Sequence, residues 1–209
     1  MSFFSKHKFL FLVMIIFFLV LLVIAFLFTS PMSASINSNW SRLQFDVKLL
    51  RLNTNIDVYE NHQKIGVVKG NIIRLITDPL TYYDVNGQKI AYADDTYHFI
   101  AQDSHTIVVD GVVTAEMVGK VKLIGEAYGI YNAEGQLIAN AEFGIFNVNG
   151  KITDVNGTTI AVYKANPILQ DFTLYISPDC SIDKETLIMI CSSYYSDQAA
   201  DSSDSDSSD

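Results

Sequence analysis

The chain has 209 residues, and its 14 lysine and arginine residues against 23 aspartate and glutamate residues give a formal net charge of −9. This balance argues against a nucleic-acid-binding protein, because such proteins neutralise phosphates with a basic surface. Between an apolar segment at the start and a polar segment at the end, the length leaves room for one folded domain.

An apolar segment, residues 9–28, follows a short basic N-terminus, residues 1–8. It contains no charge and no proline, and as a helix rising 1.5 Å per residue it is long enough to cross a ~30 Å hydrocarbon core. We predict a transmembrane anchor. The alternative is a cleaved signal peptide, with small residues at 33–35 near the cleavage site, but the apolar part of a signal peptide is usually shorter, about 7–15 residues.

Basic residues around this segment predict its orientation. Lys6 and Lys8 precede it together with the amino terminus, whereas Arg42 and Lys48 are the only basic residues in the first twenty positions after it. Because cytoplasmic flanks carry the excess of positive charge, we expect a single-pass membrane protein with a cytoplasmic N-terminus and an extracytoplasmic domain.

Residues 29–39 form a polar linker, and from residue 40 to residue 196 the pattern changes to short β-type runs separated by Gly, Asn and Asp. Short connections join antiparallel neighbours, so the chain is predicted to be mainly β, folded as a closed antiparallel barrel or a sandwich. The predicted runs are 43–50, 65–68, 71–75, 80–83, 89–92, 97–101, 106–109, 117–124, 127–131, 136–141, 144–147, 159–163 and 172–176.

Three near-copies of one nine-residue pattern occur, at residues 83–91, 131–139 and 153–161. In each copy an Asp or Asn is suited to cap a turn with its side chain, and a Gly supplies a positive φ. A weaker copy lies at 59–66, and an overlapping turn is predicted at 147–152. The turn residues are Asp84, Gly87, Asn132, Gly135, Asp154 and Gly157.

The last ordered element is predicted to be a helix at residues 181–195, with Ser181 or Asp183 as N-cap. Residues 187–191 are apolar on every side of a helix, which indicates a helix surrounded by protein; one more buried strand is the alternative. The acidic Ser/Asp tail, residues 197–209, has the composition of a disordered segment. The core of the predicted helix contains Leu187, Ile188, Ile190 and Cys191.

The sequence contains no recognisable catalytic or metal-binding motif. The four histidines are scattered. In Asp103-Ser104-His105, adjacent residues of a strand would face opposite sides, and no nucleophile elbow is present. Cys180 and Cys191 would lie ~16 Å apart if a helix separates them, too far for a disulfide, so we predict two free, buried thiols. We expect no catalytic residue, no cofactor and no metal.

Four residues after the apolar segment are candidates for contact with lipid head groups, because aromatic and basic side chains just outside a membrane span often lie at the level of the head groups. The alternative is the first strand of the barrel with solvated charges on one face. These residues are Trp40, Arg42, Lys48 and Arg51.

The repeated hairpins, the runs 158–164 and 171–176 and the hydrophobic helix that follows them resemble the tubby C-terminal-like superfamily, in its LURP-one-related and phospholipid-scramblase-like branch. The resemblance implies a barrel of about twelve antiparallel strands around one central hydrophobic helix, here residues 181–195. Members are typically non-enzymatic, and some contact phosphoinositides or scramble lipids. The cysteine-rich segment and the acidic calcium loop of scramblases are not readable in this sequence.

These features together lead us to expect a non-catalytic, single-pass membrane-anchored barrel module for binding or scaffolding at the membrane or cell envelope. Its partners would be the bilayer, through the N-terminal helix, and lipid head groups, an envelope polymer or another protein. A scramblase-like, lipid-handling protein is the alternative. An enzyme whose residues converge from distant strands is less favoured.

Overall fold

The structure is a computed structural model that describes residues 11, 13–19, 21, 36–50, 53–71, 79–95, 104–121, 125–144, 148–166 and 171–205. The chain divides into two compact units, Met1–Ser33 and Ala34–Asp209. Each unit is described by itself.

Of the predicted transmembrane segment, residues 11, 13–19 and 21 are described, and they are helical with exposed side chains. The remainder of residues 9–28, the N-terminus 1–8 and linker residues 29–35 lie outside the described residues. Within the part of the chain that is described, no helix is both long enough and apolar enough to cross a membrane. The anchor therefore stays a prediction.

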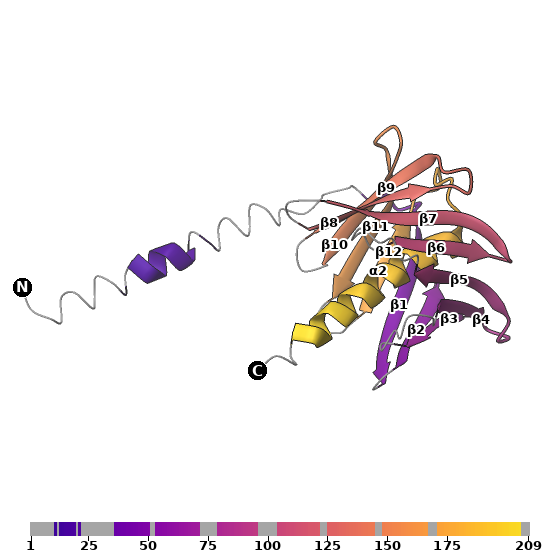
Figure 1. Ribbon diagram of the computed structural model, residues 1–209, viewed down its shortest axis with the longest axis horizontal. Helices are drawn as coiled ribbons and strands as arrows, with labels where there is room; N and C mark the ends of the chain where they lie inside the picture. Colours follow the sequence, from indigo (N-terminus) through magenta and orange to yellow (C-terminus); the bar gives the residue numbers. More distant parts are fainter. Residues whose placement is uncertain are drawn as a thin grey trace, which may run out of the picture. The chain divides into compact units, whose positions relative to one another are not determined.

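The second unit is a closed barrel of antiparallel strands in which each strand pairs with its neighbours in sequence and β12 returns to β1 (Figure 1). This confirms the predicted mainly β, antiparallel architecture with twelve strands and decides for a barrel over a sandwich. The strands are β1 (Ser41–Leu50), β2 (Asn53–Glu60), β3 (Gln63–Asn71), β4 (Leu80–Asp84), β5 (Lys89–Asp95), β6 (Ser104–Val109), β7 (Val112–Lys120), β8 (Glu126–Tyr131), β9 (Leu137–Phe143), β10 (Asn149–Asp154), β11 (Thr159–Asn166) and β12 (Asp171–Ile176).

The repeated pattern forms three equivalent hairpin turns, β4–β5, β8–β9 and β10–β11. In the first, Asp84 Oδ1 accepts hydrogen bonds from the backbone N–H of Asn86 at 2.9 Å and of Gln88 at 2.8 Å. Asp154 caps the β10–β11 turn in the same way. In the β8–β9 turn, Asn132 Oδ1 accepts a hydrogen bond from the backbone N–H of Gln136 at 2.8 Å. The glycines have φ between 76° and 83°, the left-handed region that glycine adopts without strain: Gly87, Gly135 and Gly157.

Two strands differ from the predicted runs. β2 was not among them, although Thr54, Ile56 and Val58 alternate as buried residues along it. β10 covers most of the segment predicted as the turn 147–152, and that prediction is wrong for residues 149–152. The Asn-Gly pair there serves packing: a Cβ on Gly150 would lie 2.5 Å from Cδ1 of Phe143 on the neighbouring strand. The predicted run 97–101 lies outside the described residues, as do residues 72–75, 122–124 and 145–147 of the predicted runs 71–75, 117–124 and 144–147.

The C-terminal helix α2 (Lys184–Ser205) packs against the barrel and begins later than predicted, with Asp183 as its N-cap. The Asp183 carboxylate accepts a 2.7 Å hydrogen bond from the backbone N–H of Thr186. Every residue from 187 to 193, and Tyr194 after them, is 0% exposed, so two full turns of the helix are covered on all sides. The helix contacts β4, β5, β6 and β7, and Tyr194 packs against rings on β8, β9 and β11.

Polar contacts tie both ends of α2 to the strands. Near its start, Lys184 Nζ lies 3.0 Å from Glu60 Oε2 on β2. Near the opposite end of the barrel, His105 Nε2 on β6 lies 2.7 Å from Asp197 Oδ2. The helix continues to Ser205, so the predicted disorder does not hold for residues 197–205; extending an anchored helix costs less than starting one. Residues 206–209 lie outside the described residues.

Both cysteines are free, as predicted. Cys191 on α2 is fully buried, but Cys180, which precedes the helix, is only half-buried, so the prediction that both are buried is wrong for Cys180. Burial raises the pKa of the Cys180 thiol, and it raises the pKa of the Cys191 thiol to about 12.

Aromatic rings fill much of the space between α2 and the strands, and one of them carries a hydroxyl that the packing does not satisfy. Tyr163 on β11 is 1% exposed, and its ring contacts Phe143, Phe172 and Tyr194. No hydrogen-bond partner for its hydroxyl is found within the described residues.

We expect Tyr163→Phe to leave the free energy of unfolding unchanged or to raise it by up to about 1 kcal/mol, because an unpaired buried hydroxyl is costly. Chemical denaturation followed by fluorescence of the single tryptophan, Trp40, measures this. A loss of more than about 1 kcal/mol in this variant would mean that the hydroxyl is hydrogen-bonded in the folded protein.

Candidate functional site

The structure separates the four residues predicted to face lipid. Trp40 is half-buried just before β1, and Arg42 is exposed near the start of that strand, with its guanidinium 6.0 Å from the centre of the Tyr175 ring. Lys48 lies six positions further along β1, a separation of about 20 Å. Arg51 lies outside the described residues. The described members therefore do not form one basic patch.

The predicted central-helix residues lie in the packed interior. Leu187, Ile188, Ile190 and Cys191 are all 0% exposed, and side chains from the barrel strands surround them. The turn residues, in contrast, use their polar atoms within their own hairpins. The outer side of the barrel is therefore the better place for a binding site.

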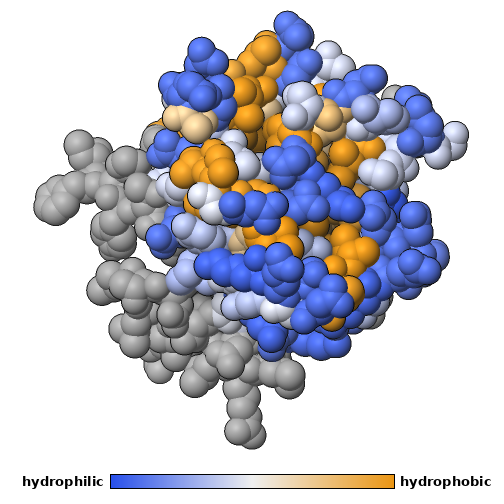
Figure 2. Space-filling model, turned by 90° about the vertical axis from the view of Figure 1, so that its right-hand side faces the viewer, coloured by the Kyte–Doolittle hydropathy of each residue, from blue (hydrophilic) through white to orange (hydrophobic). Residues whose placement is uncertain are grey.

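Hydrophobic residues on the barrel surface form separate patches with hydrophilic residues between them (Figure 2). The more exposed ones include valines next to hairpin turns, such as Val85, Val112 and Val155. Single exposed apolar side chains of this kind are normal in folded proteins and do not by themselves mark a site.

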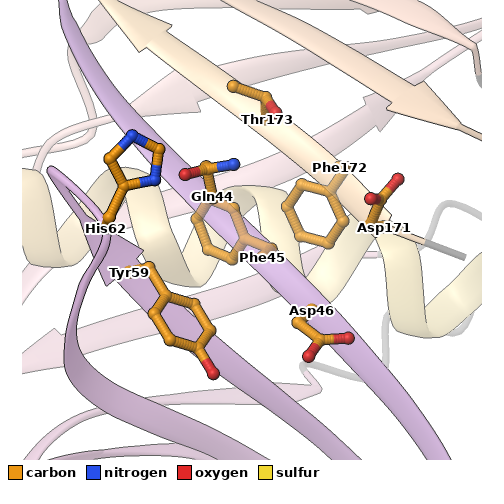
Figure 3. A pocket seen from close by; sticks show the side chains of 8 residues that line it. All are labelled: Gln44, Phe45, Asp46, Tyr59, His62, Asp171, Phe172 and Thr173. Atoms are coloured by element: carbon orange, nitrogen blue, oxygen red, sulfur yellow. The ribbon is translucent and has the colours of Figure 1, made fainter.

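A pocket of about 290 Å³ lies where β1, β12 and the end of β2 meet. Along β1 the buried Phe45 alternates with Gln44 and Asp46, which point to the outer side, and along β12 the buried Phe172 alternates in the same way with its polar neighbours. Figure 3 shows these side chains around the two phenylalanine rings. The lining residues are Gln44, Phe45, Asp46, Tyr59, His62, Asp171, Phe172 and Thr173.

Strand register brings the lining residues together in cross-strand pairs. Gln44 is opposite Thr173, Phe45 is opposite Phe172, and Asp46 is opposite Asp171. The rings of Phe45 and Phe172 are stacked, with centroids 4.2 Å apart and an interplanar angle of 12°. Both rings face the barrel interior, where Phe45 is 1% exposed and Phe172 is 2% exposed. On the outer face the pocket is therefore lined by polar side chains and by the half-buried ring of Tyr59.

Three aspartates lie side by side across the outer face, because Asp46 is opposite Asp57 on β2 as well as Asp171 on β12. Asp57 is neutralised: Lys48 Nζ lies 2.5 Å from its Oδ2 and Lys64 Nζ lies 2.5 Å from its Oδ1. Asp46 and Asp171 have no ion pair within the part of the chain that the structure describes. Like charges directly opposite in a sheet repel, so these two carboxylates raise the free energy of the unliganded barrel.

Asp57 is the aspartate of this row on which stability depends. Burial alone would raise the pKa of its carboxyl, but the hydrogen bonds and positive charges of Lys48 and Lys64 outweigh burial and hold the pKa below its usual value. A lowered pKa in the folded state means that the ion pairs stabilise the protein at pH values above the unfolded pKa of about 3.9. That contribution is lost as the pH falls below this value.

We therefore expect Asp57→Asn to lower the free energy of unfolding by about 1–2 kcal/mol at pH 7, because both lysines are half-exposed and solvent weakens the pairs. The difference from the unaltered chain should shrink as the pH falls below about 4. Denaturation curves at several pH values measure this, with Asp94→Asn, at an exposed aspartate of β5, as control. A difference that stays constant down to pH 2 would contradict the assignment.

No protein-family model matches the chain, and neither does any curated protein or solved structure. The assignment of a site therefore rests on geometry alone. Among the described residues, no three histidine, cysteine, aspartate or glutamate side chains are grouped so that they could hold a metal ion.

Sequence reasoning missed the pocket because its residues come from three separate segments. The alternation of polar and apolar residues along β1 and β12 is visible in the sequence and places Gln44, Asp46 and Asp171 on one side of their strands. Nothing in the sequence pairs β1 with β12, because 120 residues separate the ends Leu50 and Asp171 of these strands. Without that pairing, Asp46 and Asp171 are two unrelated surface residues.

Proposed function

We propose that the protein is a non-catalytic, single-pass membrane-anchored module that presents its barrel at the membrane or in the cell envelope and binds a ligand on the outer face. The observation that carries this proposal is the complete burial of α2 residues 187–194. A helix covered on all sides takes up the interior space that many β-barrels use for a ligand, which leaves the outer pocket as the better candidate.

The anchor in this proposal is supported by the length and apolarity of residues 9–28 and by the helical conformation of residues 11, 13–19 and 21. The exposed side chains at these positions are all apolar, and eight of them are 45% exposed or more: Phe11, Val13, Met14, Ile16, Phe17, Phe18, Leu19 and Leu21. A helix that is apolar all round suits a lipid environment.

We also propose that the chain is a distant relative of the tubby-like barrel proteins. The support is architectural: twelve antiparallel strands in a closed barrel, followed by one buried C-terminal helix. The proposed relationship extends to the fold and not to a ligand, because the residues of this chain do not match a known lipid or calcium site.

Membrane attachment is tested by fractionating cells that express the full chain and washing the membranes with alkaline carbonate. We expect the protein to stay in the membrane pellet. The variant Ile16→Arg/Leu19→Arg should move to the soluble fraction, since charges in the centre of a span are costly. Release of the unaltered protein by carbonate would refute the anchor.

Orientation is tested by treating intact cells with protease. Degradation of the barrel domain while a cytoplasmic marker survives is the result expected for an extracytoplasmic domain. Survival of the barrel in intact cells and its loss after lysis would place it in the cytoplasm and overturn this part of the proposal.

A further inference from the structure

The pocket beside β1 and β12 brings together several polar side chains that bind no other side chain of the described residues. Within the described residues, none of its six polar side chains makes a side-chain hydrogen bond or ion pair. In contrast, Asp57 on the neighbouring strand β2 forms ion pairs with Lys48 and Lys64. The polar groups open to a ligand are those of Gln44, Asp46, Tyr59, His62, Asp171 and Thr173.

The hydrogen-bond donors and acceptors of these groups indicate which kind of ligand the pocket can bind. The carboxylates of Asp46 and Asp171 accept hydrogen bonds, the hydroxyls of Tyr59 and Thr173 both donate and accept, and the amide of Gln44 does both. A molecule that uses all of them must carry several donors and acceptors close together. A ring with neighbouring hydroxyl groups has this property.

The half-buried ring of Tyr59 gives the pocket an aromatic surface on the outer face, whereas the stacked rings of Phe45 and Phe172 are buried in the barrel interior (Figure 3). Sugar rings have C–H groups that pack against aromatic side chains while their hydroxyls reach polar groups at the edge. The volume of about 290 Å³ is at the low end for small-molecule sites, so the pocket suits one sugar unit and not a longer chain.

The negative charge of the pocket restricts the class of ligand further. Two carboxylates directly opposite one another exclude anionic sugars such as uronic acids, because the ligand would add a third negative charge. Two lysines reduce the negative potential of the pocket. Lys164 on β11 is opposite Thr173 on β12, and Lys48 lies two positions after Asp46 on β1. The site is therefore less suited to a simple organic cation, which would also leave Gln44 and Thr173 unused.

We infer that this pocket binds one neutral sugar ring, as a unit of a polysaccharide that the membrane-anchored barrel meets at its surface. The inference deepens the proposed function, since it names the ligand class of the same outer-face site. Each hydroxyl that donates to Asp46 or Asp171 forms a charge-assisted hydrogen bond, the strongest kind available in this pocket.

The test uses the full chain in a detergent without a sugar head group and three probes with the same ring: glucose, glucuronic acid and glucosamine. Ligand-observed NMR at millimolar concentration reports binding of each probe. We expect glucose to bind and glucuronic acid to bind at least about tenfold more weakly. A fourth probe, cellotetraose, distinguishes a polysaccharide ligand from a free sugar. We expect cellotetraose to bind at least as tightly as glucose.

Variants decide where a bound sugar lies. We expect Asp46→Asn/Asp171→Asn to weaken glucose binding about tenfold or more and to reduce the discrimination against glucuronic acid. Asp94→Asn, at an exposed aspartate of β5, should change neither property. Glucose affinity that is the same in the double variant and the unaltered chain would overturn the inference.

Two further outcomes would also overturn it. No binding of glucose or cellotetraose at millimolar concentration would exclude a neutral sugar site. Binding of glucosamine much tighter than glucose, and falling steeply with salt, would instead identify a cation site. Neither outcome affects membrane attachment, which the carbonate wash tests separately.

Discussion

Tyr194→Ala is expected to destabilise the barrel by about 3–5 kcal/mol, because it removes a large ring from the centre of a closed core. Tyr194 is 0% exposed and stacks on Phe143 with centroids 3.5 Å apart, and it makes edge contacts with Tyr128 and Tyr163. The cavity left behind cannot collapse easily, since rigid strands hold three of its walls. A loss of this size is a large fraction of the stability of an ordinary domain.

The measurement is chemical denaturation of the full chain, followed by the fluorescence of Trp40. Tyr92→Ala is the matched control: Tyr92 is half-buried on β5, where the Lys89 amine lies 4.0 Å from the centre of its ring. We expect this control to cost no more than about 1 kcal/mol. If the two substitutions cost the same, Tyr194 is not part of a packed core and α2 does not lie within it.

The second large effect is the protection of the Cys191 thiol. This thiol is fully buried and its pKa is raised to about 12, so in the folded protein it is both inaccessible and protonated near pH 8. Because only the thiolate is reactive, a thiol reagent should label Cys191 at least about 10³-fold more slowly than a free thiol, at a rate set by opening of the barrel.

Two single variants separate the thiols. In Cys191→Ala the remaining half-buried Cys180 should react without denaturant, more slowly than a free thiol because burial also raises its pKa. In Cys180→Ala the remaining Cys191 should react only when denaturant unfolds the domain. Rapid labelling of Cys191 in native conditions, with Trp40 fluorescence unchanged, would show that α2 is open to solvent.

Much of the local structure was predictable from the chain. The turn pattern around Asp84, Asn132 and Asp154 is a local signal, because each cap bonds to backbone groups two to four residues away. The same residue types led to a wrong turn prediction at Asn149-Gly150. These two residues lie inside β10, and the glycine leaves space for the Phe143 ring. Packing between strands, which a local pattern does not contain, decided that case.

By itself, the sequence determined the strand-and-turn pattern, the apolar helix after β12 and the net acidic charge, since each depends on neighbouring residues or on composition. Only the tertiary structure decided that the sheet closes between β1 and β12 and that this closure places Asp46 opposite Asp171 above the stacked Phe45 and Phe172. Closure and register are long-range properties: they depend on how all strands fit around α2, and shifting one strand by a single residue would turn its polar side chains inward.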